Sequence, residues 1–187
     1  LSVVEPTLWV DYIYLDTDER RRFAQVSHEY LIEQLQFESK TGGKSMDLNF
    51  NHPVKELIWI ASVATATGGR ASLAGPGYKL KLNGHDRFAA RNFRYFTRTQ
   101  VWEHHSGAGG LAYDTDSTST GKFNDSIGVY SFALKPEEHQ PSGTCNFSRI
   151  DNAQLTSGAN DTSAVVYAVN YNVLRIMSGM GGLAYSN

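Results

Sequence analysis

The sequence predicts an all-β protein, an eight-stranded antiparallel jelly-roll sandwich with a short helix and long loops. About eight segments have strand composition or alternation, and 17 glycines and five prolines supply many turns. The composition, 41% hydrophobic and 12% aromatic, is sufficient for a core. Eight antiparallel strands in 187 residues favour two packed sheets over a closed barrel. We therefore expect residues 1–187 to form a single domain.

The first two predicted elements are a strand and a short helix. Residues 8–15 are aromatic and β-branched with apolar side chains on both faces, which predicts a strand buried on both sides. Asp16 and Thr17 then offer N-cap oxygens, and Glu19 occupies the capping-box position. We expect a helix over residues 18–25.

A hairpin is predicted next. Residues 29–37 form a strand pattern with Leu31, Leu35 and Phe37 on one face. A glycine-containing turn at residues 41–43 leads to a second strand over residues 46–50.

The middle of the chain predicts two strands and two loops. Residues 55–63 contain a short apolar run with β-branched residues and Trp59, which favours a strand. Residues 64–86 are rich in small and polar residues and predict a long surface loop. Residues 88–102 predict a strand with one solvent-facing side, with a helical start as the alternative. Residues 106–125 predict an exposed polar loop.

The last third gives the clearest strand signals. Tyr130, Phe132 and Leu134 alternate along residues 129–134, and residues 144–151 form another strand candidate. Residues 165–174 have the strongest period-two pattern in the sequence.

Charge and cysteine content exclude several classes of function. The 17 basic and 19 acidic residues give a net charge of −2, so we expect no direct nucleic-acid binding. Cys145 is alone, which rules out an intrachain disulfide and favours a reducing compartment. No apolar run approaches the roughly 20 residues that span a bilayer. Because the chain starts at Leu1 without a signal peptide, we expect it to be a piece of a longer protein.

Ten segments, in order along nearly the whole chain, carry a resemblance to a known family. They are VDYIYLD (10–16), ERRRFA (19–24), HEYLIEQLQ (28–36), NHPVKEL (51–57), LNGHDRF (82–88), YSFALKP (130–136), QPSG (140–143), NFSRID (146–151), YNVLR (171–175) and GMGGLAY (179–185). The chain resembles the major capsid protein of nucleocytoplasmic large DNA viruses, the group that includes phycodnaviruses and iridoviruses.

The resemblance implies a structural protein and not an enzyme. Proteins of this family have two consecutive jelly rolls, and this chain would correspond to the C-terminal one, with the N-terminal jelly roll absent. Three copies would form a pseudo-hexagonal capsomer of an icosahedral virion shell, assembled in the host-cell cytoplasm. The implied partners are identical subunits, neighbouring capsomers, and minor capsid and penton proteins. An internal viral membrane would lie nearby without insertion of this chain.

Several motifs have a functional and a structural interpretation. Residues 41–45 (TGGKS) resemble a phosphate-binding loop, but Glu38 stands where that motif needs glycine, so we expect a turn. Glu103, His104 and His105 would point to opposite faces of a strand and not hold one metal. Cys145 is expected to pack as a small side chain. We predict no catalytic residue, no metal and no cofactor.

Two other functions remain open. A metal enzyme of the cupin type would need a His-x-His pattern, which none of the six histidines forms. A carbohydrate-binding jelly roll would use loop aromatics such as Tyr78 or Tyr113.

Three asparagines and one arginine run complete the candidate sites. Asn124, Asn146 and Asn160 begin glycosylation triplets, and we expect Asn124 and Asn160 in loops. The run Arg20-Arg21-Arg22 predicts a solvated helix face or an ion-pair surface between subunits.

Overall fold

The computed structural model describes residues 7–40, 43–61, 77–107, 111–113, 123–125, 127–157 and 164–186. The chain divides into two compact units. One comprises the chain up to Leu31 together with Val173–Ser186, and the other comprises Ile32–Asn172. Most elements in the described residues are strands in antiparallel sheets, which confirms the predicted all-β class.

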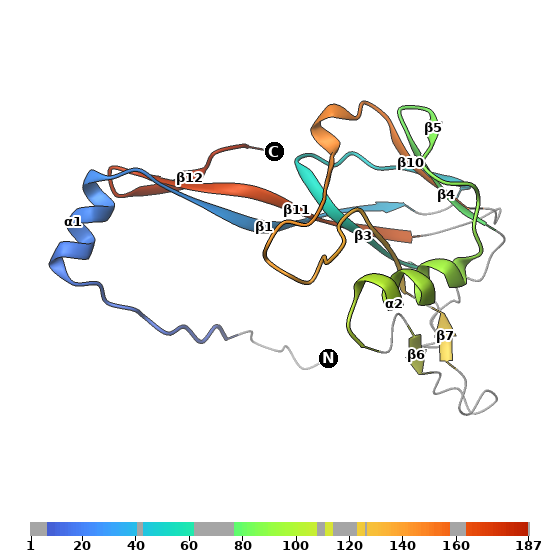
Figure 1. Cartoon of the computed structure of the whole chain (residues 1–187), viewed down its shortest axis with the longest axis horizontal. Helices are drawn as coiled ribbons and strands as arrows, with labels where there is room; N and C mark the ends of the chain where they lie inside the picture. Colours follow the sequence, from blue (N-terminus) through green and yellow to red (C-terminus); the bar gives the residue numbers. More distant parts are fainter. Residues whose placement is uncertain are drawn as a thin grey trace. The chain divides into compact units, whose positions relative to one another are not determined.

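The first unit contains the predicted helix and a tight hairpin. Helix α1 covers Thr17–Gln25, and the Asp16 side chain caps it by accepting a hydrogen bond from the Thr17 N–H. Strand β11 (Ala164–Met177) ends in this unit and turns into β12 (Met180–Leu183), as Figure 1 shows. Ser178 and Gly179, with φ of 52° and 77°, form the two-residue turn. The Gly179 N–H donates to Phe23 O of α1.

The predicted buried strand over residues 8–15 is wrong. The segment has no assigned strand, and its side chains are exposed, with Trp9 and Tyr14 each 90% exposed. A strand needs a neighbour to pair its backbone groups, and no described strand pairs with this segment. Its apolar side chains therefore lack a covering partner within the described residues.

The second unit holds most of two sheets. The larger sheet has the order β1-β11-β3-β8, with β9 also paired to β3 and β12 to β11. The smaller sheet has the order β2-β10-β4-β5, and β6 pairs with β7 separately (Figure 1). The strand bounds are β1 His28–Lys40, β2 Ser45–Asp47, β3 Pro53–Ala61, β4 Tyr78–Leu82, β5 His85–Asp86, β6 Leu111–Tyr113, β7 Phe123–Asp125, β8 Ile127–Ser131, β9 Cys145–Asn146 and β10 Ala153–Ser157.

Twelve strands occur in the described residues, where eight were predicted. The additional strands are two to five residues long, too short for a periodicity argument to identify. The predicted hairpin around residues 41–43 is also wrong, because β1 belongs to the larger sheet and β2 pairs with β10 in the smaller one. The chain crosses between the sheets at this point.

Two predicted loops contain strands. Strands β4 and β5 lie inside the expected loop over residues 64–86, of which residues 64–76 lie outside the described part. In β4, Tyr78 and Leu80 are buried and alternate with Lys79 and Lys81, a pattern that the small residues before it obscured. The expected loop over residues 106–125 contains β6 and β7.

The predicted strand over residues 144–151 is only partly correct. Strand β9 covers two residues and gives way to the 3-10 helix Phe147–Arg149, capped by the Asn146 side chain. The next strand, β10, was missed because Ser157 takes one of its buried positions, beside Ala153 and Leu155.

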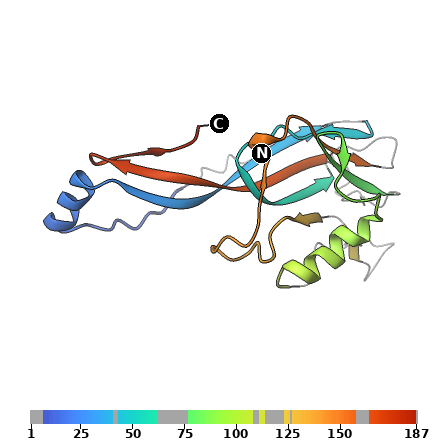
Figure 2. The same ribbon diagram turned by 45° about the horizontal axis from the view of Figure 1, so that its top comes forward.

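The strand predicted over residues 88–102 is wrong, because the chain is helical from residue 93 to residue 104. A π-helix, η1 (Tyr95–Thr99), continues into α2 (Gln100–His104), and Figure 2 shows them as one helical stretch. The buried side chains are Phe93, Phe96, Thr97, Gln100 and Val101, which is the spacing of one helix face. Two of the five are polar, so the apolar pattern alone concealed the helix.

An aromatic core fills the second unit. Trp59 of β3 is 1% exposed, and its ring centroid lies 5.1 Å from that of Phe96 and 6.0 Å from that of Tyr78. The alternation predicted over residues 165–174 is confirmed as far as Asn170, because Val166, Ala168 and Asn170 are fully buried and the residues between them are partly exposed. It breaks there, since Tyr171 and Asn172 are buried as well. The helical stretch η1–α2 and strand β4 thus pack on β3, the strand that its short apolar run predicted.

Candidate assembly surface

Between Gln34 and Phe37, strand β1 turns its polar side chains inward and its apolar side chains outward. Gln36 donates from Nε2 to Asn170 Oδ1 (3.0 Å) and to Asn51 O (2.8 Å), and its Oε1 accepts from the Asn51 N–H. Gln34 Oε1 accepts from Asn172 Nδ2 at 2.9 Å. Buried amides are stable only when paired, so these bonds fix which face of β1 points inward. The alternating positions, Leu35 and Phe37, must then point out.

The outward side chains continue across the sheet as one surface. Phe37 contacts Tyr167 of β11, with ring centroids 6.1 Å apart. Tyr167 is paired with Ile58 of β3, and Val165 with Ile60, so these side chains share that face. We call this surface the outer apolar face and define it by Leu35, Phe37, Ile58, Ile60, Val165 and Tyr167.

The outer apolar face is open to solvent in the isolated chain. Leu35 is 60% and Phe37 67% exposed, whereas the other four members are partly exposed. Folded monomers rarely leave contiguous apolar patches of this kind uncovered, and such patches mark interaction sites. The prediction that Leu35 and Phe37 share a face is confirmed, and the face is an external one.

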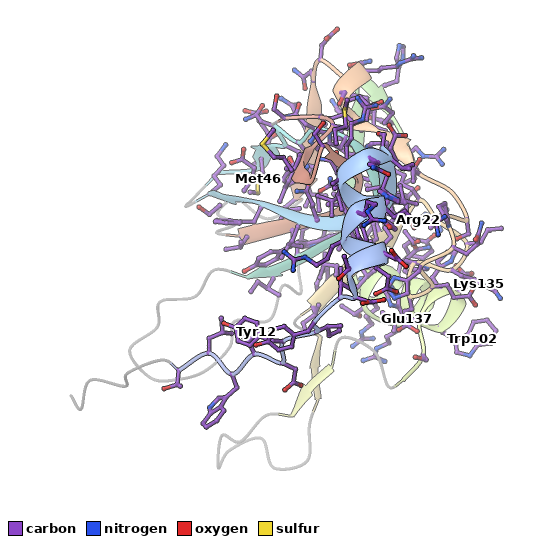
Figure 3. All side chains as sticks on the ribbon, turned by 90° about the vertical axis from the view of Figure 1, so that its left-hand side faces the viewer. Tyr12, Arg22, Met46, Trp102, Lys135 and Glu137 are labelled. Atoms are coloured by element: carbon purple, nitrogen blue, oxygen red, sulfur yellow. The ribbon has the colours of Figure 1, made fainter. Side chains whose placement is uncertain are left out.

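The first unit exposes apolar side chains of its own. The segment before α1 carries Tyr12, which is 80% exposed and projects from an extended stretch in Figure 3. On the β11–β12 hairpin, Met180 is 74% and Tyr185 62% exposed. On α1, Arg20, Arg21 and Arg22 are exposed, and Arg21 lies 3.5 Å from Asp18. This agrees with the predicted solvated helix face.

The Glu103-His104-His105 sequence lies at the end of α2 and not on a strand. His104 Nδ1 lies 3.0 Å from Leu134 O. His105 Nε2 lies 2.9 Å from Glu56 Oε2, and its Nδ1 lies 3.2 Å from Glu137 Oε1. Contact with the Glu56 carboxylate is the main cause that raises the pKa of His105. Among the described residues, no group of three or more histidine, cysteine or acidic side chains could hold a metal ion.

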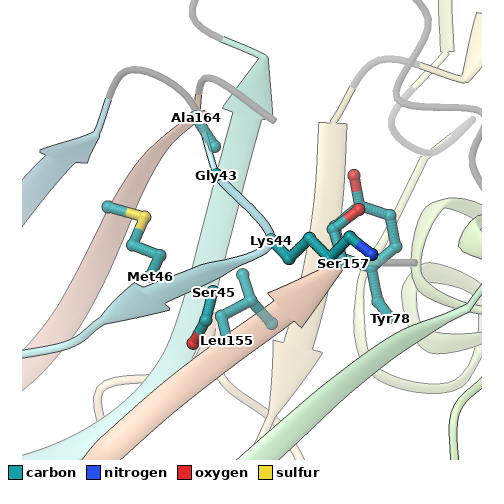
Figure 4. A pocket seen from close by; sticks show the side chains of 8 residues that line it. All are labelled: Gly43, Lys44, Ser45, Met46, Tyr78, Leu155, Ser157 and Ala164. Atoms are coloured by element: carbon teal, nitrogen blue, oxygen red, sulfur yellow. The ribbon is translucent and has the colours of Figure 1, made fainter. Parts of the chain in front are cut away.

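The glycine-lysine-serine segment borders a shallow pocket. Gly43 has φ of 98°, and Ser45 begins β2. Figure 4 shows the pocket between these residues, Tyr78 and Ser157. Lys40 Nζ donates to Ser45 O, so a side chain of the chain itself binds this turn. Thr41 and Gly42 lie outside the described residues.

The sugar-platform alternative loses one of its two aromatic residues. Tyr78 is 2% exposed and packs on Phe93, and burial raises the pKa of its hydroxyl. A ring buried in this way cannot stack on a sugar, so its assignment to a loop platform was wrong. The side chain of Tyr113, in β6, lies outside the described set. Cys145 packs partly buried against the core, and burial raises the pKa of its thiol.

The three glycosylation asparagines differ in their surroundings. Asn124 lies in β7, not in a loop, and its side chain is not described. Asn146 is exposed, and its Oδ1 accepts from the Ser148 N–H at 3.1 Å. Asn160 lies outside the described residues. Glycosylation at all three stays a prediction.

Comparison with known proteins identifies relatives. The family model for the large eukaryotic DNA virus major capsid protein matches residues 19–182. The major capsid protein of Pyramimonas orientalis virus is 56% identical over 198 residues, covering 100% of this chain and 50% of that protein. That of Paramecium bursaria Chlorella virus 1 is 41% identical over 256 residues, covering 100% of this chain and 55% of that protein. The chain thus spans about half the length of the curated relatives it matches.

A solved structure agrees with this result. The chain matches a structure titled "PBCV-1 virus capsid, quasi-atomic model" with a TM-score of 0.72 and 37% identity, over 94% of this chain and 56% of that one. The match confirms the predicted jelly-roll fold.

In the described part of the chain, no helix is long and apolar enough to cross a membrane.

Proposed function

Because the chain belongs to the family of large eukaryotic DNA virus major capsid proteins, we propose that its role is structural, as part of the subunit that builds an icosahedral virion shell. The outer apolar face is the observation that carries this proposal. A subunit that packs against other copies needs an apolar face on a rigid sheet, and Leu35 and Phe37 supply it. In this proposal the protein is not an enzyme, and its function is to pack against other subunits.

The finer assignments belong to the same proposal. Residues 1–187 act as the C-terminal jelly roll of a double jelly roll, and three subunits make a pseudo-hexagonal capsomer. Neighbouring capsomers, minor capsid proteins and penton proteins complete the shell, which assembles in the host-cell cytoplasm. The net charge of −2 supports a role without direct genome contact. An internal viral membrane lies nearby without insertion of the chain.

Coverage of the outer apolar face stabilises the assembly through the hydrophobic effect. Burying a side chain such as Phe37 from a largely exposed state contributes about 1.5–3 kcal/mol. A single face of this size gives modest affinity between two copies. A closed capsomer uses several such faces at once, and the free energies then reinforce one another.

Electron microscopy of the full-length protein tests the proposal. We expect trimers of hexagonal outline, and we expect Phe37→Glu to reduce their yield because a charge would be buried without a partner. Asn49→Glu, at an exposed position after β2, is the charge-matched control and should assemble normally. Isolated monomers of the unmodified protein, or equal trimer yields for both variants, would contradict the proposal.

A further inference from the structure

A chain of alternating charges crosses the second unit beside the core. Glu33 Oε1 of β1 lies 2.7 Å from Lys55 Nζ of β3, and the neighbouring Glu56 pairs with His105. His105 in turn contacts Glu137, which lies in the segment of residues 134–142. Three acidic groups thus alternate with one permanent cation and one titratable cation.

A register irregularity places the two central members of this chain. Asn170 of β11 pairs with Val54, and Val169 pairs with Glu56, so Lys55 has no partner in the ladder. Lys55 O instead accepts from the N–H groups of Phe132 and Ala133. The Lys55 and Glu56 side chains are 4% and 8% exposed, so both charges are buried and depend on partners.

Glu56 depends on His105 for its compensation. Glu56 Oε2 and His105 Nε2 are both buried, and neither atom makes a hydrogen bond within the described residues, so the ionic contact between them is what compensates each. At 2.9 Å apart, each is the other's compensating group. A buried carboxylate beside a neutral imidazole would lose that charge compensation. The ion pair therefore requires the imidazole to be protonated.

His105 also fixes the surface segment. Glu137 accepts from the Ser106 N–H with both carboxylate oxygens, at 3.1 Å each, and from Ser106 Oγ at 2.7 Å. His104, beside His105, contacts Leu134 O at the start of the segment. Glu137 is exposed. The end of α2 and residues 134–142 are thus held together at two points.

We propose that protonated His105 is a pH-dependent latch, which holds the end of α2 and residues 134–142 against β3 and releases them when the imidazole loses its proton. The latch lies within one chain, so it operates whether or not the chain builds a shell. The stability of the contact between the end of α2, residues 134–142 and β3 therefore depends on pH.

The pH window follows from the two titrating groups. The pKa of His105 is raised from its ordinary 6.5, so the latch is complete below that value and is lost as the pH rises through the raised pKa. Hydrogen bonds from Ser106 lower the pKa of Glu137 from 4.5, so its contribution is lost only as the pH falls through that lowered value. The latch is closed between these limits.

The other charged groups near His105 are accounted for. On the helix α2 that precedes His105, Glu103 lies 3.9 Å from the neighbouring His104. Lys135 and Glu138, in the facing segment, pair with each other at 3.1 Å. His139 lies 3.6 Å from Glu33, but its side chain is 99% exposed. Among these described groups, His105 has a largely buried side chain that contacts both Glu56 of β3 and Glu137 of the segment.

The test compares urea unfolding of the protein and of His105→Gln from pH 5.5 to 9. We expect the unmodified protein to be more stable at the acidic end and to lose this advantage as the pH rises. His139→Gln is the control and should keep the pH dependence of the unmodified protein. Parallel stability curves for the protein and His105→Gln would overturn the proposal.

A second measurement needs no variant. Amide hydrogen exchange of Ser106 in the unmodified protein, corrected for the intrinsic rate, reports the contact with Glu137. We expect its protection to fall as His105 deprotonates, while protection in β3 stays constant. Constant protection of Ser106 across the same range would count against the latch, whatever the behaviour of the variant.

Discussion

Gly128 illustrates how one residue without a side chain sets the packing of the aromatic core. A Cβ added there would lie 2.6 Å from Trp59 Cε2 and 2.8 Å from Phe93 Cε2. Both rings belong to fully buried side chains that cannot move aside. We predict that Gly128→Ala lowers the free energy of unfolding by about 1–3 kcal/mol, the usual cost of overpacking. Urea denaturation measures this change.

Gly182 provides the matched control. It also lies in a strand, β12, but an added Cβ would meet no atom within 4 Å. Gly182→Ala should leave the stability unchanged or raise it slightly. Similar losses for both variants would show that the strand backbone, and not contact with Trp59, makes Gly128 necessary.

Single residues also show where prediction from the sequence ends. The alternation of β11 was predicted from the period-two pattern of residues 165–174, and Val166 and Ala168 are buried on one of its two faces. Asn170 continues that face only because Gln36, far away in the sequence, pairs with its amide. The Glu56–His105 pair likewise joins distant segments, and no local pattern indicates it.

At the scale of elements, the helical stretch η1–α2 protects an edge of the larger sheet. Strand β8 is at the end of that sheet's strand order. The Gln100 side chain accepts a hydrogen bond from the Ser131 N–H at 3.0 Å, and its Nε2 donates to Tyr95 Oη. A helix that covers an exposed edge prevents pairing with other chains.

Removal of this side chain should destabilise the protein. We predict that Gln100→Ala lowers the free energy of unfolding by about 1–3 kcal/mol, because the buried Ser131 N–H loses its acceptor. Gln154→Ala is the control, since Gln154 bonds Asp47 at an exposed site and should cost less than about 1 kcal/mol. Equal losses in thermal or urea unfolding would contradict the role given to Gln100.

The same stretch explains why secondary structure was harder to predict than fold class. Phe93, Phe96 and Val101 fit a helix only when Thr97 and Gln100 are counted on the same face. A periodicity search that considers apolar residues alone finds no helix there. Turn composition and strand count were sufficient for the all-β class, since they do not depend on any one element.

At the scale of the whole molecule, the composition of residues 8–15 indicated apolar side chains that are buried in the complete protein. It did not indicate which surface buries them. The family match begins at residue 19, after this segment. The relatives are about twice as long as the chain. Under the proposed function, we expect neighbouring parts of the shell to cover this segment and the outer apolar face.

The resemblance supplied what physical reasoning from the residues could not. Alternation, turns and composition indicated two packed sheets, but a jelly roll serves many functions. The direction in which β1 faces depends on the Gln34 and Gln36 amide pairs, which are visible only in the structure. The proposed role in assembly rests on the outward apolar side chains of this strand.

Hydroxyl-radical footprinting of Phe37 and Tyr167, in assembled capsids and in the separate chain, tests the central claim most directly. In the separate chain Phe37 is 67% exposed, so we expect rapid oxidation there. In the capsid we expect the oxidation of both rings to fall several-fold because another jelly roll covers them. Equal oxidation of Phe37 in both samples would show that this face stays open, and would contradict the account.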